Sequence, residues 1–219
     1  MLKTWWRQAP VTVALCGLMI LCYLITATQS LSLLDNLPES WLADHSVLYL
    51  PVMNEPWGPM RAITAAFMHI GPAHLLLNLL LLFLLGREVE GSYGSRLYLL
   101  VWVVAAIGAS TVSVWMDPLV ATAGASGVGY ALMVIFAFIV AKRGGDLRGP
   151  IVLILANIAY TFMTPTVSLW GHLGGLLAGL LLSLALLPRS RALWVVLVGA
   201  FFIAGLLWRI SSFHSGWLF

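Results

Sequence analysis

The chain contains 219 residues, of which 61% are hydrophobic and only 9% are charged. Soluble domains are roughly half apolar and about one quarter charged, so a soluble core of this length could not bury so much apolar side chain. The composition therefore excludes an ordinary soluble domain and predicts that the lipid bilayer is the solvent. The formal net charge of +3 gives no reason to expect a nucleic-acid partner.

Seven apolar stretches are predicted to cross the membrane, because a helix of about 20 apolar residues spans the hydrocarbon. The fifth of them is short. No internal repeat divides the chain, so the sequence predicts one all-α, polytopic transmembrane helix bundle over 1–219, with a core at about 10–187 and an extra C-terminal span. The stretches lie at 10–30, 72–88, 95–116, 126–141, 149–164, 167–187 and 192–210.

The first stretch follows Lys3 and Arg7, a pattern that is also found in cleaved signal peptides. Its length, and the absence of a good small-x-small site before the next loop, favour a retained membrane anchor. Cys16 and Cys22 lie in this stretch and point to different sides of a helix, so no disulfide is expected between them.

The basic residues indicate the orientation of the spans. Cytoplasmic loops carry an excess of Lys and Arg, and only Arg61 and Arg209 would lie outside if the N-terminus is inside. We therefore expect a cytoplasmic N-terminus and an external, periplasmic C-terminus, in a bacterial inner membrane given the small size and compact layout. The inner basic residues are Lys3, Arg7, Arg87, Arg96, Lys142, Arg143, Arg148, Arg189 and Arg191.

A long outer segment, at about 31–71, joins the first two spans, whereas the other connections are short. It carries Trp41 and Trp57, and its apolar content is too high for a floppy linker. Because Trp and Tyr concentrate at the membrane–water boundary, we expect this segment to lie on the membrane interface. A purely structural outer cap is the alternative that composition leaves open.

A glycine-flanked serine stands where an outer loop turns into the fourth span, in the run Gly124-Ala125-Ser126-Gly127. The serine could be a helix N-cap, and the small residues could serve helix packing. Glycines beside a serine also let a substrate approach closely and leave the serine amide free to hold an oxyanion. The motif alone therefore permits either a structural residue or a nucleophile.

A histidine in the sixth span is followed by glycines on its own helix face. His172, Gly175 and Gly179 share that face by their spacing, and small residues at such intervals mark close helix contact. The histidine is therefore predicted to face into the bundle. It could be a satisfied buried histidine, or a neutral base that accepts a proton from a serine.

Polar residues also open the second span. His74 and Asn78 lie one turn apart on one face, after the helix start that Gly71-Pro72 predicts. Both side chains can donate hydrogen bonds to an oxygen anion, although a polar contact between helices is the alternative. At about 1.5 Å per residue, Asn78 and His172 reach nearly the same depth from the outer side, and Ser126 matches them if its loop dips inward.

With these three motifs in order, the chain resembles the rhomboid family of intramembrane serine proteases. The resemblance covers about 57–180. It includes the Gly-x-Ser-Gly signature around Ser126, the His-x-x-Gly-x-x-x-Gly pattern that begins at His172, and the His-x-x-x-Asn pattern of His74 and Asn78. Any one motif would be weak evidence, whereas the three in the expected spans are specific.

The resemblance implies a dyad in which Ser126 is the nucleophile and His172 its base. It also implies an oxyanion hole formed by the Ser126 amide, His74 and Asn78. Four further residues would support the site, with the Tyr130 ring beside His172. These are Gly124, Gly127, Tyr130 and Gly175.

Outside the site, the resemblance implies that His69 braces the outer loop and that Glu90 with Gly94 forms a structural motif at the inner side. One departure is that Trp57 and Arg61 are not adjacent, so the Trp-Arg pair of the family is matched only loosely. In addition, Gly171 precedes His172 where many relatives have Ala.

Other chemistries fit the sequence less well. The outer halves of the spans contain no Asp or Glu that could complete a triad, and there is no His-Glu-x-x-His run for zinc. We therefore expect no metal and no cofactor. The expected partners are membrane lipid and transmembrane protein substrates, which would be cleaved near the outer face. The alternatives are a catalytically inactive relative that binds membrane helices, or a small transporter. The sequence does not predict the oligomeric state.

Overall fold

The computed structural model describes residues 8–164 and 167–216, and within them the regular structure is helical apart from one isolated bridge between Leu48 and Thr122. Each predicted span coincides with a helix to within five residues at either end. The seven long helices are α2 (Pro10–Ser30), α5 (Gly71–Tyr93), α6 (Ser95–Met116), α7 (Ser126–Lys142), α8 (Arg148–Met163), α9 (Leu169–Ala185) and α10 (Arg191–His214).

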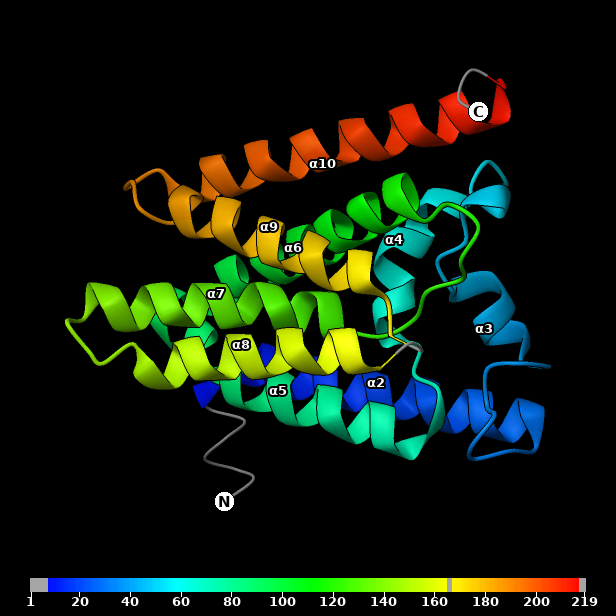
Figure 1. The fold of residues 1–219 in the computed structure, drawn as a ribbon, viewed down its shortest axis with the longest axis horizontal. Coiled ribbons are helices and arrows are strands. Elements are labelled where there is room, and N and C mark those ends of the chain that lie inside the picture. Colours follow the sequence, from blue (N-terminus) through cyan, green and yellow to red (C-terminus); the bar gives the residue numbers. More distant parts are fainter. Residues whose placement is uncertain (1–7, 165–166, 217–219) are drawn as a thin grey trace.

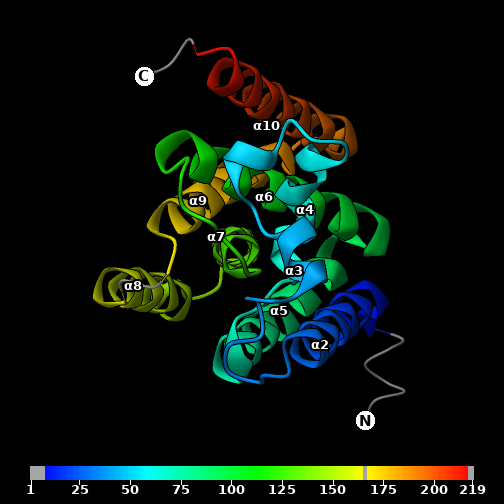
Figure 2. The ribbon, with the colours of Figure 1, turned by 90° about the vertical axis from the view of Figure 1, so that its right-hand side faces the viewer.

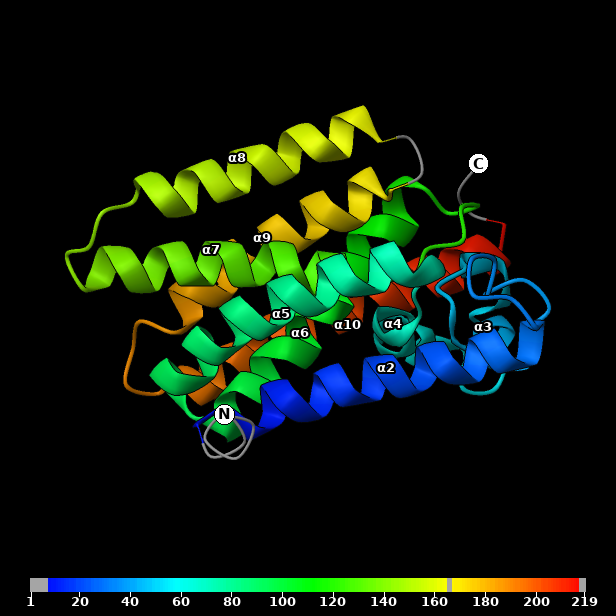
Figure 3. The ribbon, with the colours of Figure 1, turned by 90° about the horizontal axis from the view of Figure 1, so that it is seen from below.

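The long helices run roughly parallel to one another along the long axis of the molecule (Figure 1). Seen end-on, α7 lies at the centre, with α5, α6, α8 and α9 arranged around it (Figure 2). Helix α2 packs against α5 at one edge (Figure 3), while α10 covers α6 and α9 at the opposite edge (Figure 1). The all-α, polytopic bundle that the sequence predicts is confirmed.

Helix length differs within the bundle. Helices α2, α5, α6 and α10 have 21 to 24 residues and are long and apolar enough to cross a membrane. The other three have 16 or 17 residues, which at 1.5 Å per residue gives roughly 25 Å, less than the roughly 30 Å of a typical hydrocarbon layer. The sequence placed the sixth span at 167–187, but α9 begins only at Leu169 because Ser168 caps it by accepting the Gly171 amide.

The inner end of the bundle depends on one buried carboxylate. Glu90 is 2% exposed, and its oxygens accept the backbone N–H groups of Val11 and Thr12 at 3.0 and 2.8 Å. It also accepts the hydroxyl groups of Thr12 and Ser95. The first N–H groups of a helix have no partner within it, so Glu90 caps α2 from α5 and ties both to α6. Its position fits the structural role that the resemblance implies.

The outer segment between α2 and α5 is folded. It contains the short helices α3 (Trp41–Ser46) and α4 (Arg61–Thr64) and the 3-10 turns η1 (Leu50–Val52), η2 (Gly58–Met60) and η3 (Ala65–Phe67). Leu48, Leu50 and Met53 are buried in a cluster with residues of α6 and α10. The segment therefore forms a packed cap, while its location on a membrane interface stays a prediction.

Arg61 is buried in this segment, whereas its two tryptophans are exposed. Arg61 is buried and donates from Nη1 to the Val47 carbonyl at 2.8 Å, so it braces the segment. Trp41 and Trp57 are 67% and 83% exposed, as a residue in contact with lipid headgroups would be.

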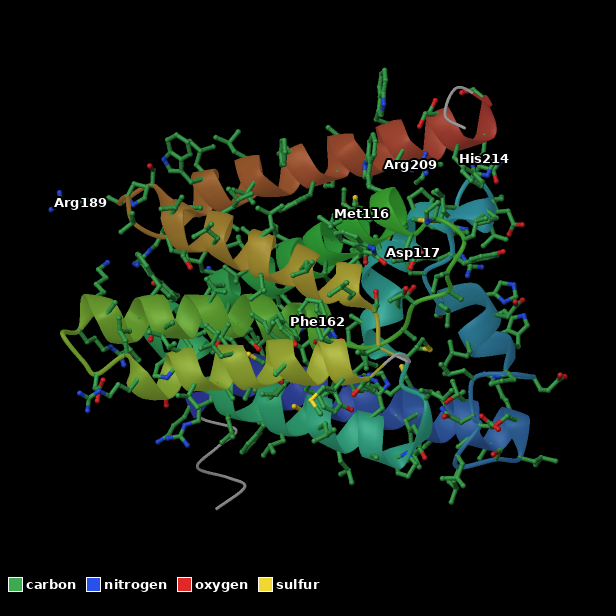
Figure 4. All side chains as sticks on the ribbon, viewed as in Figure 1. Met116, Asp117, Phe162, Arg189, Arg209 and His214 are labelled. Carbon is green, nitrogen blue, oxygen red and sulfur yellow. The ribbon has the colours of Figure 1, made fainter. Side chains whose placement is uncertain are left out.

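The two ends of the bundle carry different polar residues. Figure 4 shows Arg189 at one end of the molecule, and Asp117, Arg209 and His214 toward the other. At that second end, His214 contacts the Pro51 carbonyl through Nε2 at 3.1 Å, and Arg209 donates to the Val114 carbonyl. The extra C-terminal span therefore also fastens the outer segment.

Candidate active site

Ser126 is the first residue of α7, and the segment before it is held inside the bundle. Thr122 exchanges two backbone hydrogen bonds with Leu48, and the Gly124 N–H donates to the Ala65 carbonyl at 2.9 Å. Ala125 is only 2% exposed. The loop thus dips inward, which is the condition for Ser126 to share the depth of the other polar residues. The N-cap of α7 is Ala125 and makes no side-chain cap, so the capping interpretation of Ser126 is wrong.

Helices α7 and α9 approach each other through glycine. A Cβ built on Gly175 would collide with the carbonyl of Gly127, and one on Gly179 would lie 2.7 Å from the Ala131 carbonyl oxygen. Only glycine permits backbones to come this close. Because His172 lies on the same face of α9 as both glycines, this approach carries its ring to α7.

The contact that results is a hydrogen bond of 2.7 Å between His172 Nε2 and Ser126 Oγ. His172 is 5% exposed, and the Tyr130 ring stacks on it with centroids 4.4 Å apart and planes inclined by 20°. An imidazole nitrogen at this distance can take the proton of the hydroxyl as the oxygen attacks a carbonyl. The pair is chemically equipped for acyl transfer.

The other ring nitrogen of His172 reaches a residue that the sequence motifs did not indicate. Its Nδ1 lies 2.7 Å from Thr161 Oγ1 on α8, and Thr161 is 6% exposed. Asn157 and Thr161 are one turn apart in the predicted fifth span, and polar residues within a span need a partner or a purpose. These two polar residues were the sequence signal that could have indicated a contact between α8 and the site.

The candidate oxyanion donors are only partly brought together. The His74 ring packs against Gly124, where an added Cβ would stand 2.7 Å from Nε2. Asn78 is buried and uses its amide inside α5, donating from Nδ2 to the His74 carbonyl at 2.9 Å. The Ser126 N–H is the first of α7 and therefore has no acceptor within the helix, at the end where the helix dipole favours negative charge.

His69 links the outer segment to this turn. Its carbonyl accepts from Asn36 Nδ2 at 2.9 Å, and its Nε2 accepts the Ala125 N–H at 3.4 Å. Burial lowers the pKa of His69 to about 3. The ring is therefore neutral near pH 7, which leaves Nε2 free to accept while Nδ1 faces the Phe67 carbonyl.

A cavity of about 30 Å³ lies beside Ser126, between α6, α7 and the outer segment. Hydroxyl groups of Ser110, Ser113 and Thr122 are among its lining. A water molecule needs roughly 10–15 Å³ of such space and two to four polar partners. The cavity therefore has both the size and the chemistry to hold a water molecule next to the serine.

The bundle is thus a polytopic membrane protein in which the buried His172 of α9 bonds the half-buried Ser126 at the start of α7, the pair of groups that serine hydrolases use. The chain belongs to the rhomboid family: the family model of the rhomboid domain matches residues 56–189. It is a multi-pass membrane protein of that family.

Three relatives illustrate the range of the family. Rhomboid protease GluP of Bacillus subtilis is 34% identical over 152 residues, covering 67% of this chain and 30% of the relative. Rhomboid protease GlpG of Haemophilus influenzae is 29% identical, covering 80% and 90%. Inactive rhomboid-related protein 2 of Caenorhabditis elegans is 28% identical, covering 84% and 57%. The chain thus spans 30% of the length of GluP and 57% of the length of the C. elegans protein.

The close approach of α7 and α9 predicts a steric effect at Gly175. Gly175→Ala should lower stability by roughly 1–3 kcal/mol, the usual cost of overpacking, because its Cβ meets the Gly127 backbone. Thermal unfolding in detergent measures this. Gly17→Ala is the matched control, since Gly17 also lies in a span and a Cβ there has nothing within 4 Å. Equal melting temperatures for the two variants would contradict the prediction.

Proposed function

We propose that this protein is an intramembrane serine endopeptidase that uses Ser126 as nucleophile and His172 as general base. The observation that carries the proposal is the 2.7 Å contact between Ser126 Oγ and His172 Nε2 at the N-terminus of α7. Membership of the rhomboid family and similarity to proteins named as rhomboid proteases support it.

The reaction begins when Ser126 Oγ attacks the scissile carbonyl and His172 Nε2 takes the hydroxyl proton. The charge that develops on the carbonyl oxygen is held by the Ser126 N–H, with His74 and Asn78 as further donors. Asn78 Nδ2 carries a second N–H besides the one that it donates to the His74 carbonyl, and this second N–H is the one offered to the substrate. His172 delivers the proton to the leaving amine, and water from the neighbouring cavity hydrolyses the acyl-enzyme.

The proposed substrates are transmembrane segments of other membrane proteins. A helix hides its carbonyl groups in its own hydrogen bonds, so the cleaved segment should contain helix-weakening and small residues near the cut. The proposed setting is a bacterial inner membrane, with the N-terminus cytoplasmic and Ser126 toward the periplasmic face. No metal or organic cofactor has a role in this mechanism.

An inactive, helix-binding protein is the second candidate, because the C. elegans relative carries the word inactive in its name. The presence of both Ser126 and His172 in hydrogen-bond contact favours the protease. A fluorophosphonate probe distinguishes them, since it reacts only with an activated serine.

The first test of the proposal is Ser126→Ala. This variant should neither cleave a model transmembrane substrate nor react with the probe, while its thermal unfolding stays close to that of the wild type. His172→Ala should be equally inactive, because residues that act as one unit are not additive. Ser183→Ala serves as the control, since Ser183 is a buried serine of α9 whose hydroxyl donates to the Gly179 carbonyl of the same helix. Undiminished cleavage by Ser126→Ala would end the nucleophile assignment.

Asn78→Ala tests the oxyanion hole separately. Loss of one donor should lower kcat by about 10- to 1000-fold with less effect on KM. Steady-state kinetics with the same substrate measures both constants. A higher KM with unchanged kcat would place Asn78 in substrate binding instead.

Orientation can be tested by cysteine labelling in intact cells, after Cys16 and Cys22 are replaced. Asn54→Cys lies in the exposed part of the outer segment and should react with a membrane-impermeant thiol reagent. Asp146→Cys lies in the exposed connection between α7 and α8 and should be protected until the membrane is permeabilised. The reverse pattern would place Ser126 toward the cytoplasm and refute the proposed geometry of cleavage.

A further inference from the structure

Helix α8 contacts the candidate site through a polar side chain. Among its described residues only Pro150 and Thr161 are buried, and Pro150 lies at its inner start. Thr161 lies at the opposite end of α8, where its hydroxyl meets both His172 and Tyr130. A buried threonine between two functional side chains is a candidate for setting the position of their hydrogen atoms.

Four short contacts run in series from α8 to Ser126. The Asn157 carbonyl and Tyr130 hydroxyl oxygens are 2.5 Å apart, as are the Tyr130 and Thr161 hydroxyl oxygens. Thr161 Oγ1 and His172 Nδ1 are 2.7 Å apart, and so are His172 Nε2 and Ser126 Oγ. Each of these four contacts is short enough to require a hydrogen atom between its two heavy atoms.

Four hydrogen atoms are available for these contacts. Three hydroxyl groups contribute one each, and a neutral imidazole contributes one. A carbonyl oxygen contributes none, so the Tyr130 hydrogen must lie on the Asn157 carbonyl. The Thr161 hydroxyl also lies 3.0 Å from the Asn157 carbonyl oxygen, but its hydrogen must point to Tyr130, because that shorter contact has no other hydrogen. The imidazole hydrogen must then lie on Nδ1, pointing to Thr161. Only then does His172 Nε2 keep its lone pair for the Ser126 hydroxyl.

The other tautomer of His172 leaves one contact without a hydrogen atom. If Nε2 carried the proton, Thr161 would have to donate to Nδ1. The single Tyr130 hydrogen could then serve Asn157 or Thr161, and the remaining pair of oxygen atoms would face each other at 2.5 Å. Two unshared acceptors at that separation in a buried site repel, which disfavours this tautomer.

We propose that Thr161 is a positioning residue that holds His172 in the Nδ1–H tautomer, with the Asn157 carbonyl as the acceptor that fixes the direction of the series. The effect on catalysis rests on the proposed function, whereas the tautomer itself can be observed without any cleavage. Thr161 fills the place of the third group that orients the base in other nucleophile–base pairs. A hydroxyl does so without the cost of a charged carboxylate in the membrane.

The same arrangement serves the reaction step. When Nε2 accepts the Ser126 proton, the ring becomes an imidazolium with both nitrogen atoms protonated. Its Nδ1–H already points at the Thr161 oxygen, so the new cation is hydrogen-bonded on both sides as it forms. Loss of a hydrogen bond to a group that becomes charged should lower kcat by roughly 10- to 100-fold, with little change in KM.

The experiment compares Thr161→Val, which removes the hydroxyl at similar volume, with Thr161→Ser, which keeps it. Thr111→Val is the matched control: Thr111 is also 6% exposed in a span, and its hydroxyl oxygen lies 2.8 Å from the carbonyl oxygen four residues before it, as that of Thr161 lies 3.0 Å from its own. The full chain is labelled with ¹⁵N in its histidine rings, and nitrogen chemical shifts report which ring nitrogen carries the proton. His172→Ala assigns the His172 signals, and kcat and KM are measured in parallel.

The expected result is an Nδ1–H ring in the wild type, in Thr161→Ser and in Thr111→Val, and a mixed or reversed tautomer with reduced kcat in Thr161→Val. An Nε2–H ring in the wild type would overturn the proposal whether or not the valine variant folds, as would an unchanged ring spectrum in a folded Thr161→Val. If the tautomer depends on Thr161 but the wild type cleaves no substrate, the positioning role stands and the proposed protease function fails.

Discussion

The backbone contact between Gly127 and Gly175 is the constraint on which the rest of the site depends. A side chain on Gly175 would collide with the Gly127 backbone and force α9 away from α7, and with it the His172 ring away from Ser126. Lipid offers no hydrophobic force that pulls two apolar helices together, so close packing of small residues is what associates them. The same steric fit that stabilises the bundle therefore also places the serine against the histidine.

Two connected sets of polar groups hold helices of this bundle together. At the inner end the Glu90 carboxylate joins α2, α5 and α6. Toward the outer end, the hydrogen-bonded series from Asn157 to Ser126 joins α7, α8 and α9. Because an unsatisfied polar group in hydrocarbon is costly, each set holds its helices in one relative position. In the outer set, that requirement also orients the candidate base.

The sequence predicted the seven helices well, because the length of an apolar run and the positions of Gly, Pro and Ser bear directly on where a helix can begin and end. It also predicted that His172 faces the bundle, since Gly175 and Gly179 share its face. It did not predict Thr161, whose partner is 11 residues away across a turn. Nor did it predict that the Asn78 amide donates to the His74 carbonyl of its own helix, because the choice of side-chain rotamer leaves no periodic pattern in a sequence.

The cap of the first helix has a consequence for assembly during synthesis. The N–H group of Thr12 finds its acceptor in Glu90, 78 residues further along the chain. A ribosome therefore releases the whole of α2 before the carboxylate that completes it exists. Until α5 has entered the bilayer, water or lipid headgroups must accept the hydrogen bonds of the first N–H groups of α2. The start of α2 thus gains this cap only once the second span packs beside the first.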